Sequence, residues 1–318
     1  MNVIEHLNEL NGKPSFSIEI LPPLKGVNIN EIFESLAPVI EYNPAFINVT
    51  YHREEFEYRE TPSGLWEKRV IRKRPGTVGI CAAIQNKFKV DAVPHILCGG
   101  FTKEETENLL IDLNFLGIDN VIALRGDAVK SETYFSAKKD GHPYASELVK
   151  QITNLNEGIY LDDTLENKTK TNFCVGVAGY PEKHFESPNL DTDIAHLKEK
   201  VDNGASYIIT QLFYDNAKFF SFVDKCRAAG IDVPIIPGLK PFTTQRQLNI
   251  IPQRFHVDIP SDLAIEVLNA QSKEEIREIG ADWMINQSRE LIDAGFNLIH
   301  FYTMGRTDAI CKLAKTLL

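Results

Sequence analysis

Side chains capable of proton transfer and anion binding stand at the ends of short apolar runs along the chain. Glu19 lies in FSIEILPP, Arg125 and Asp127 lie in IALRGD, and His184 lies in VAGYPEKH. Carboxyl, guanidinium and imidazole groups move protons and hold anionic ligands. Other polar residues occupy equivalent places, namely Thr50, His95, Tyr180, Gln211, Tyr302 and Arg306. The repetition predicts one site that is assembled from the ends of several strands.

Glu19 carries the sharpest chemical indication, because three aliphatic residues flank it within an apolar run. Burial in such surroundings disfavours the ionised carboxylate and raises the pKa, which would make Glu19 a usable general acid near neutral pH. Pro22 and Pro23 follow and give the chain a rigid, extended exit. The alternative is a strand-end glutamate whose carboxylate reaches solvent or pairs with a lysine, and the residues alone leave both interpretations open.

The other polar positions are individually ambiguous. Arg125–Asp127 offers a guanidinium, a flexible glycine and a carboxylate, but an ordinary surface turn has the same composition. His95 is either a ligand-binding residue or a hydrogen-bonded histidine of the strand interior. No two histidines have the spacing of a metal site such as H-E-x-x-H, so we expect no metal centre.

The elements that must position these residues follow from the hydrophobic pattern. Eight short apolar runs are expected to be strands: Phe16–Leu21, Phe46–Tyr51, His95–Cys98, Val121–Leu124, Phe173–Ala178, Tyr207–Phe213, Ile235–Leu239 and Leu298–Tyr302. Most are continuously hydrophobic, which is typical of parallel strands buried on both faces. Segments with helical periodicity separate them, and no G-x-G-x-x-G run indicates an open dinucleotide-binding sheet. The pattern predicts an α/β fold, a (β/α)8 TIM barrel with insertions, as a single domain over residues 1–318.

Several segments depart from a minimal barrel. Gly76–Ile84 favours a helix over a ninth strand, and Leu155–Asn172 is a polar insertion. Residues 252–290 make the last connection long and contain two helical patterns. Lys68–Arg74 is the one basic cluster, for which a solvated loop or helix face is favoured over a phosphate contact.

Composition excludes several classes of protein. The 318 residues include 34 Lys and Arg against 44 Asp and Glu, a formal net charge of −10 that disfavours nucleic acid and anionic membranes as partners. The five scattered cysteines fit neither a disulfide framework nor a metal motif, and we interpret them as reduced core thiols. The chain begins with no signal-peptide pattern and contains no apolar membrane span, so we expect a cytoplasmic protein. We also expect a homo-oligomer of unspecified size.

In their order and spacing, these strand ends resemble the methylenetetrahydrofolate reductase family from about Ser15 to about Arg306. The segments that carry the resemblance are FSIEILPP, INVTYH, VPHILCGG, NVIALRGD, PYASELV, YPEKH, DIAHLKEKVDNGASYIITQLFYD, IPGLKP and HFYTMGR. The resemblance implies a barrel that holds FAD, which takes a hydride from NADH or NADPH and passes it to 5,10-methylenetetrahydrofolate, giving 5-methyltetrahydrofolate. Similarity to short bacterial members favours NADH.

The resemblance also assigns roles to residues. Glu19 should be the general acid that opens the five-membered ring of the folate, and Asp127 should stabilise the cationic intermediate and bind the pterin. Gln211, Tyr302 and Arg306 should contact the folate. The residues at flavin-binding positions are Thr50, His95, Arg125, Gly126, Asp127, Tyr144, Ala145, Tyr180, His184, Asp193 and Lys200.

Two segments depart from the family pattern. After the segment that matches Ile236–Gly238, some bacterial members have an aromatic residue that sandwiches nicotinamide or folate against the flavin. This chain has Gln245 at the matching place, and Phe242 is close but out of register. Glu54–Lys73 is long and charged and receives no function. Since the chain ends at Leu318, we expect no C-terminal regulatory domain and no inhibition by S-adenosylmethionine.

Two other functions remain open at this point. A barrel flavoprotein of the proline dehydrogenase type would oxidise a small amine and would not accept electrons from NADH. A barrel without flavin could serve as a non-enzymatic interaction module, and the purified protein would then be colourless.

Overall fold

A ring of parallel strands forms the centre of the structure, a computed structural model that describes residues 1–129, 132–303 and 305–317. Its strands, in chain order, are β1 (Ser15–Ile20), β2 (Phe46–Val49), β5 (Asp91–Leu97), β6 (Asn120–Leu124), β7 (Cys174–Gly179), β8 (Tyr207–Thr210), β9 (Ile235–Ile236), β10 (Gly238–Leu239) and β11 (Leu298–Tyr302). Pro237 separates β9 from β10; β9 pairs with β8 and β10 pairs with β11, so the sheet closes on itself. The predicted (β/α)8 barrel is therefore confirmed, and β9 with β10 forms its seventh strand.

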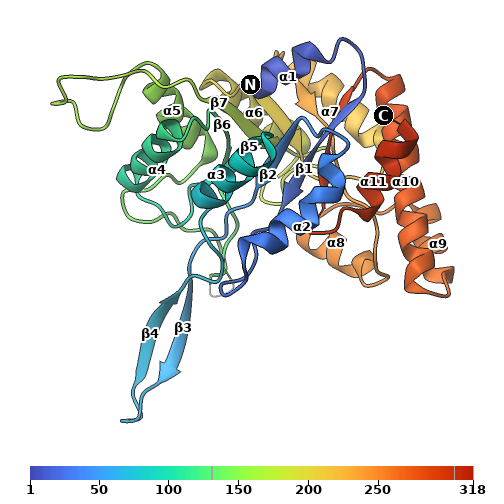
Figure 1. Cartoon of the computed structure of the whole chain (residues 1–318), viewed down its shortest axis with the longest axis horizontal. Coiled ribbons are helices and arrows are strands. Elements are labelled where there is room, and N and C mark those ends of the chain that lie inside the picture. Colours follow the sequence, from blue (N-terminus) through green and yellow to red (C-terminus); the bar gives the residue numbers. More distant parts are fainter. Residues whose placement is uncertain (130–131, 304, 318) are drawn as a thin grey trace.

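Helices surround this ring (Figure 1). They are α1 (Val3–Glu9), α2 (Ile29–Ile40), α3 (Thr77–Phe88), α4 (Lys103–Phe115), α5 (Ala145–Asn156), α6 (Leu190–Asp202), α7 (Asn216–Ala228), α8 (Gln247–Phe255), α9 (Ser261–Asn269), α10 (Lys273–Asp293) and α11 (Asp308–Leu317). Helix α3 confirms the helical interpretation of Gly76–Ile84. Thr102 and Glu105 form a reciprocal capping box at the start of α4, which satisfies two backbone N–H groups.

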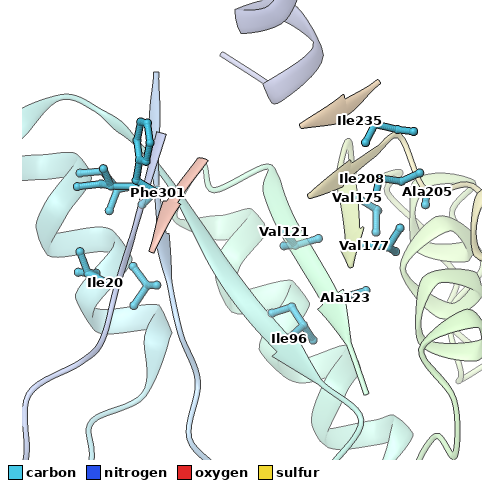
Figure 2. Close-up of a cluster of buried hydrophobic side chains, with 14 of the residues drawn as sticks. Ile20, Ile96, Val121, Ala123, Val175, Val177, Ala205, Ile208, Ile235 and Phe301 are labelled. Atoms are coloured by element: carbon cyan, nitrogen blue, oxygen red, sulfur yellow. The ribbon is translucent and has the colours of Figure 1, made fainter. Parts of the chain in front are cut away.

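The main apolar core lies between the strands and the helices. Figure 2 shows part of this layer, with Ile96, Val121 and Val175 on the neighbouring strands β5, β6 and β7. On β1, Ile18 and Ile20 belong to the same layer. Because successive strand side chains point to opposite faces, Glu19 between them faces the barrel interior.

Helix α1 closes the amino-terminal end of the barrel. Val3 is fully buried in a second apolar cluster that contains interior residues such as Phe46 and Tyr207. Asn120, at the start of β6, fixes the helix by accepting a hydrogen bond from the Val3 N–H at 2.9 Å and donating one to the Met1 carbonyl at 2.9 Å. This end of the barrel is packed, so a ligand must enter at the opposite, carboxyl-terminal end of the strands.

Three segments elaborate the barrel. The predicted polar insertion between α5 and β7 is irregular and exposed over residues 161–170, and α8, α9 and α10 extend the connection from β10 to β11. The third is an antiparallel hairpin, β3 (Glu55–Glu60) and β4 (Trp66–Ile71), that projects away from the barrel (Figure 1). The hairpin was not predicted from the sequence. It also corrects the interpretation of the basic cluster, whose first residues lie on an exposed strand and not on a loop or a helix face.

The remaining features concern compartment and redox state. In the described part of the chain, no helix combines the length and the apolar character needed to cross a bilayer. All five cysteines are free thiols, four of them buried and Cys311 partly buried. This agrees with the interpretation of the cysteines as core residues.

Candidate active site

Strand register brings three polar residues to one level at the carboxyl-terminal mouth. Glu19 on β1 lies opposite Tyr302 on β11. Leu239 on β10 lies opposite Phe301, so Lys240 follows at the level of Tyr302. Leu239 and Phe301 belong to the outer apolar layer. By strand alternation, Glu19, Tyr302 and Lys240 all face the interior.

The carboxyl group of Glu19 is held in its protonated form. Its side chain is only 16% exposed, and burial raises its pKa from the ordinary value of 4.5 to about 8, although the positive charge of Lys240 acts in the opposite direction. The same burial lowers the pKa of Lys240. Near pH 7 the mouth of the barrel therefore contains a neutral carboxylic acid, the protonation state that a general acid requires.

His95, on β5, faces this carboxyl group. Its Nε2 lies 3.4 Å from Oε2 of Glu19, and burial lowers the pKa of the imidazole to about 3, so the ring is neutral. Nε2 of His95 and Oγ1 of Thr50 are both buried and have no hydrogen-bond partner within the described protein. An unsatisfied buried polar group costs about 1–3 kcal/mol. Two such atoms at adjacent strand ends are the natural partners of a polar ligand.

Tyr302 is fixed next to Glu19. Its hydroxyl donates a 2.6 Å hydrogen bond to the carbonyl of Thr210 on β8, which ties β11 to a strand two positions away in the ring. Burial together with the nearby Glu19 raises the pKa of this phenol, so it remains protonated. Tyr302 therefore forms a rigid, neutral wall of the mouth.

A second cluster follows β6 and β7. The Arg125 guanidinium forms an ion pair with the Glu186 carboxylate at 2.5 Å, and its central carbon lies 4.9 Å from the ring centre of Phe135. The rings of Tyr180 and His184 are in edge-to-face contact with centroids 4.9 Å apart. The Arg125 guanidinium therefore lies beside the Phe135 ring and is paired with the Glu186 carboxylate.

Asp127 and the glycine before it shape the turn after β6. Gly126 has a φ of +83°, a conformation that L side chains rarely adopt, and a Cβ there would press on Leu97 at 3.3 Å. Asp127 is exposed at the mouth, and its charge contributes to raising the pKa values of Arg125 and Tyr180. The strand-end turn therefore presents a free carboxylate toward the aromatic cluster.

Two of the residues predicted at flavin-binding positions, Lys200 and Asp193, also make hydrogen bonds within the protein. Lys200 donates a 2.8 Å hydrogen bond to the Ala178 carbonyl, and burial lowers its pKa to about 8. Asp193 accepts hydrogen bonds from the His184 N–H at 3.0 Å and from the Ser187 hydroxyl at 2.9 Å. These interactions hold the loop after β7 in place and so position His184.

The other predicted residues are exposed or make local contacts. Tyr144 is 61% exposed at the start of α5, with Ala145 as the first residue of that helix. Gln211 accepts a hydrogen bond from the N–H of the next residue at 2.9 Å. Arg306 has a half-exposed side chain and lies 3.7 Å from the Asp308 carboxylate.

Phe242, the aromatic residue that is out of register with the family pattern, lies in the core. Phe242 is only 1% exposed, with its ring centre 5.0 Å from that of Tyr214, and Gln245 is exposed on the following loop. Phe242 is therefore a packing residue and offers no free face to a ligand.

Sequence reasoning missed Lys240, Glu186 and Phe135. Lys240 follows the Ile235–Leu239 run directly and so had the same strand-end signal as the residues that were selected. Glu186 and Phe135 lie on loops, and no periodic pattern could have indicated that both meet Arg125. Within the described residues, no group of three His, Cys, Asp or Glu side chains is arranged to hold a metal ion.

The fold and this cluster define the class of protein: a (β/α)8 barrel with an acid–base site at the carboxyl ends of its strands. The family model described as Methylenetetrahydrofolate reductase matches residues 3–318, and the chain belongs to that family. The resemblance seen in the sequence is thereby confirmed.

Individual relatives agree with this membership. Methylenetetrahydrofolate reductase 1 of Schizosaccharomyces pombe is 32% identical over 96% of this chain and 46% of its own length. The 5,10-methylenetetrahydrofolate reductase of Escherichia coli is 29% identical over 98% of this chain and 94% of its own length. The chain thus spans about half the length of the eukaryotic relatives and nearly all of the bacterial one.

A solved structure shows the same fold. An uncharacterized protein from Clostridium thermocellum, described as binding two copies of 5-methyl-5,6,7,8-tetrahydrofolic acid, has a TM-score of 0.59 at 16% identity. The alignment covers 98% of this chain and 97% of that one.

Proposed function

We propose that this protein reduces 5,10-methylenetetrahydrofolate to 5-methyltetrahydrofolate with bound FAD and a nicotinamide nucleotide as electron donor. The observation that carries the proposal is the protonated Glu19 carboxyl group, buried at the mouth beside two unpartnered polar atoms. Membership of the family and the bacterial relatives of nearly equal length support it.

The residues at the mouth fit a flavin. Thr50 and His95 each present a buried polar atom that lacks a partner, as a heterocycle rich in hydrogen-bonding groups would require. Arg125 would bind an anionic group once Glu186 is displaced, and Tyr180 with His184 supplies an aromatic surface. FAD, when bound, supplies hydride acceptance from the nicotinamide and hydride donation to the folate carbon. Gly126 leaves room for the ligand to approach the backbone closely.

Glu19 donates the proton in this reaction. A carboxyl group with a pKa of about 8 remains protonated at pH 7, and it can transfer its proton to a ring nitrogen of the folate as the carbon–nitrogen bond opens. The cationic intermediate that results would be stabilised by the exposed carboxylate of Asp127. Neutral His95 stays beside Glu19 without competing for the proton, because its pKa is about 3.

Lys240 limits how far the pKa of Glu19 rises. Its charge favours the ionised carboxylate, opposing the larger effect of burial. The balance leaves Glu19 protonated at neutral pH yet able to release its proton within the pH range of a cell. Burial and the charge of Lys240 together set a pKa of Glu19 that suits proton donation near neutral pH.

The purified chain tests the proposal directly. A bound-flavin spectrum that bleaches on anaerobic addition of NADH or NADPH, and returns on addition of 5,10-methylenetetrahydrofolate, is the expected result. Comparing the two nucleotides decides the donor, for which we propose NADH. A colourless protein would refute flavin dependence. Flavin that is reduced by a small amine, and by neither nucleotide, would instead identify an amine dehydrogenase.

A further inference from the structure

The hairpin of β3 and β4 has two chemically different faces. Its antiparallel register pairs Phe56 with Val70, Tyr58 with Lys68 and Glu60 with Trp66. Because strand side chains alternate, these six residues share one face, and the charged pairs between them share the other. We call the first set the apolar arm face; Leu65 is a further apolar residue in the adjoining turn.

The apolar arm face is strongly exposed. Phe56 is 42% exposed, Tyr58 59%, Trp66 67%, Val70 56% and Leu65 70%. Lys68 lies with its Nζ 3.7 Å from the ring centre of Phe56, so it covers part of one aromatic side chain. None of these residues belongs to the apolar clusters of the barrel in the described chain.

The opposite face of the hairpin carries paired charged residues, as expected of a surface in contact with water. Arg59 pairs with Glu57 at 3.4 Å and Arg69 pairs with Glu67 at 2.8 Å. Charged residues on one side and aromatic residues on the other are the alternation of a strand pair with one buried face. A two-stranded hairpin by itself is only marginally stable in water, so its apolar face indicates a partner surface.

A groove of matching character lies at the base of the hairpin. It is a cavity of about 1230 Å³, and Phe56 and Val70 form one of its walls. Val27, Ile29, Ile32, Val78, Ala83 and Leu109 contribute apolar side chains to the same cavity. The apolar arm face therefore continues into this groove.

The far end of the hairpin cannot fill its own groove. Trp66 lies four residues and Leu65 five residues along the chain from Val70, so the turn stands roughly 13–17 Å from the wall made by Phe56 and Val70. The same chain thus presents a projecting aromatic element and an apolar cavity that the element cannot reach. A surface of this kind is complementary to itself in a second copy.

We propose that two copies of this chain associate about a two-fold axis, each placing the apolar end of its hairpin in the groove of the other. Charge agrees with this arrangement. Within the described residues Glu60, which shares the face of Trp66, forms no ion pair, and Arg72 in the groove has a buried Nε without a hydrogen-bond partner. Exchange of the hairpins would bring these opposite charges together.

The available area is large enough for a stable dimer. A buried aromatic side chain contributes about 150–250 Å². At their exposed fractions, the three aromatic residues of each copy offer roughly 350 Å², and Leu65 and Val70 add to it. Two arms and the two groove surfaces that they would cover reach the ~1,200–2,000 Å² typical of specific interfaces.

The experiment measures mass in solution by light scattering across a concentration series. We expect the wild-type chain to be a dimer, and Tyr58→Ser/Trp66→Ser to raise the dimer dissociation constant at least ~100-fold, because exposed aromatic anchors dominate such interfaces. Val27→Asp, in the groove, should weaken association similarly. The matched control is Arg59→Ser/Glu67→Ser, a cross-strand pair on the charged face of the same hairpin, which should leave the dissociation constant unchanged.

Fluorescence of Trp66 gives a second readout. Trp283 is the other tryptophan, so Trp283→Phe isolates the signal, which should shift to shorter wavelength as the dimer forms. A monomer at all concentrations would overturn the proposal, as would a dimer that survives the double substitution on the apolar arm face. A dimer sensitive to that substitution but indifferent to Val27→Asp would overturn the placement of the hairpin in the groove. These outcomes do not depend on catalytic activity.

Discussion

Replacing Glu19 by Gln should stabilise the protein, and the gain should grow with pH. The native state holds a proton on Glu19 up to about pH 8, whereas the unfolded chain releases it near the ordinary pKa of 4.5. Between these values the native state binds more protons than the unfolded state, so the stability of the wild-type protein falls as pH rises. Glutamine keeps the shape of the protonated carboxyl group and does not ionise, which removes this dependence.

The size of the effect follows from the two pKa values. Each unit of pKa corresponds to about 1.4 kcal/mol, so the difference between 4.5 and about 8 amounts to roughly 5 kcal/mol once both states are ionised. At pH 5 the wild-type protein has lost only about 1 kcal/mol of this, and at pH 7.5 about 4 kcal/mol. In a chain of 318 residues the melting temperatures should then differ by roughly 1–2 °C at pH 5 and roughly 6 °C at pH 7.5.

Thermal unfolding followed by circular dichroism at five or six pH values measures this difference. Glu166→Gln is the matched control, because Glu166 is exposed on the insertion between α5 and β7. It should change the melting temperature by a small, constant amount across the range. If the melting temperatures of Glu19→Gln and the wild type differ by the same amount at every pH from 5 to 8, the claim that Glu19 is a buried, protonated acid is refuted.

Four further substitutions test other parts of the site and its support. Lys240→Leu removes the charge that favours ionised Glu19, so the alkaline limb of the folate half-reaction should move upward by about one pH unit, and an unmoved limb would show that Lys240 does not act on Glu19. Glu186→Gln frees Arg125 and should tighten FAD binding several-fold in a fluorescence titration, whereas Arg125→Ala should weaken it by at least ~10-fold; equal affinities would exclude Arg125 from the flavin site. Gly280→Ala puts a Cβ against the backbone of Phe242 and should cost about 2–3 kcal/mol in urea unfolding, and unchanged stability would contradict the packing of α10 on that loop.

The sequence predicts the barrel well because its signal is local. A strand buried on both faces must be continuously apolar, and all eight such runs are strands in the structure. A polar residue that interrupts or ends such a run lies at the carboxyl-terminal mouth of the barrel. Glu19, Thr50 and His95 could therefore be predicted as site residues from the sequence. Their proximity follows from closure of the ring.

The rest of the site depends on contacts that no local pattern contains. Arg125 meets Glu186 and Phe135, which lie on two different loops. Asp193 and Lys200 were assigned to the flavin by family pattern, and nothing in the sequence indicated the hydrogen bonds that they also make to the His184 N–H and the Ala178 carbonyl. Whether a polar group faces a ligand or its own backbone is decided by loop geometry, which composition and spacing do not determine.

The hairpin illustrates a different limit. Glu55–Arg59 alternates charged and aromatic residues, a pattern with period two that indicates a strand with one solvated face. In Trp66–Ile71 the alternation is interrupted by Lys68 and Ile71, so the sequence indicates this strand only weakly. The apolar face of the hairpin becomes apparent from the pairing of the two strands.

The two half-reactions of Glu19→Gln, measured separately by anaerobic stopped-flow spectroscopy, test the central claim most directly. Loss of the proton donor should slow reoxidation of the reduced flavin by 5,10-methylenetetrahydrofolate by about 10²–10⁴-fold, while flavin reduction by NADH stays within a few-fold of the wild type. Equal losses in both half-reactions, or a folate half-reaction that proceeds at the wild-type rate, would contradict the assignment of Glu19 as the general acid.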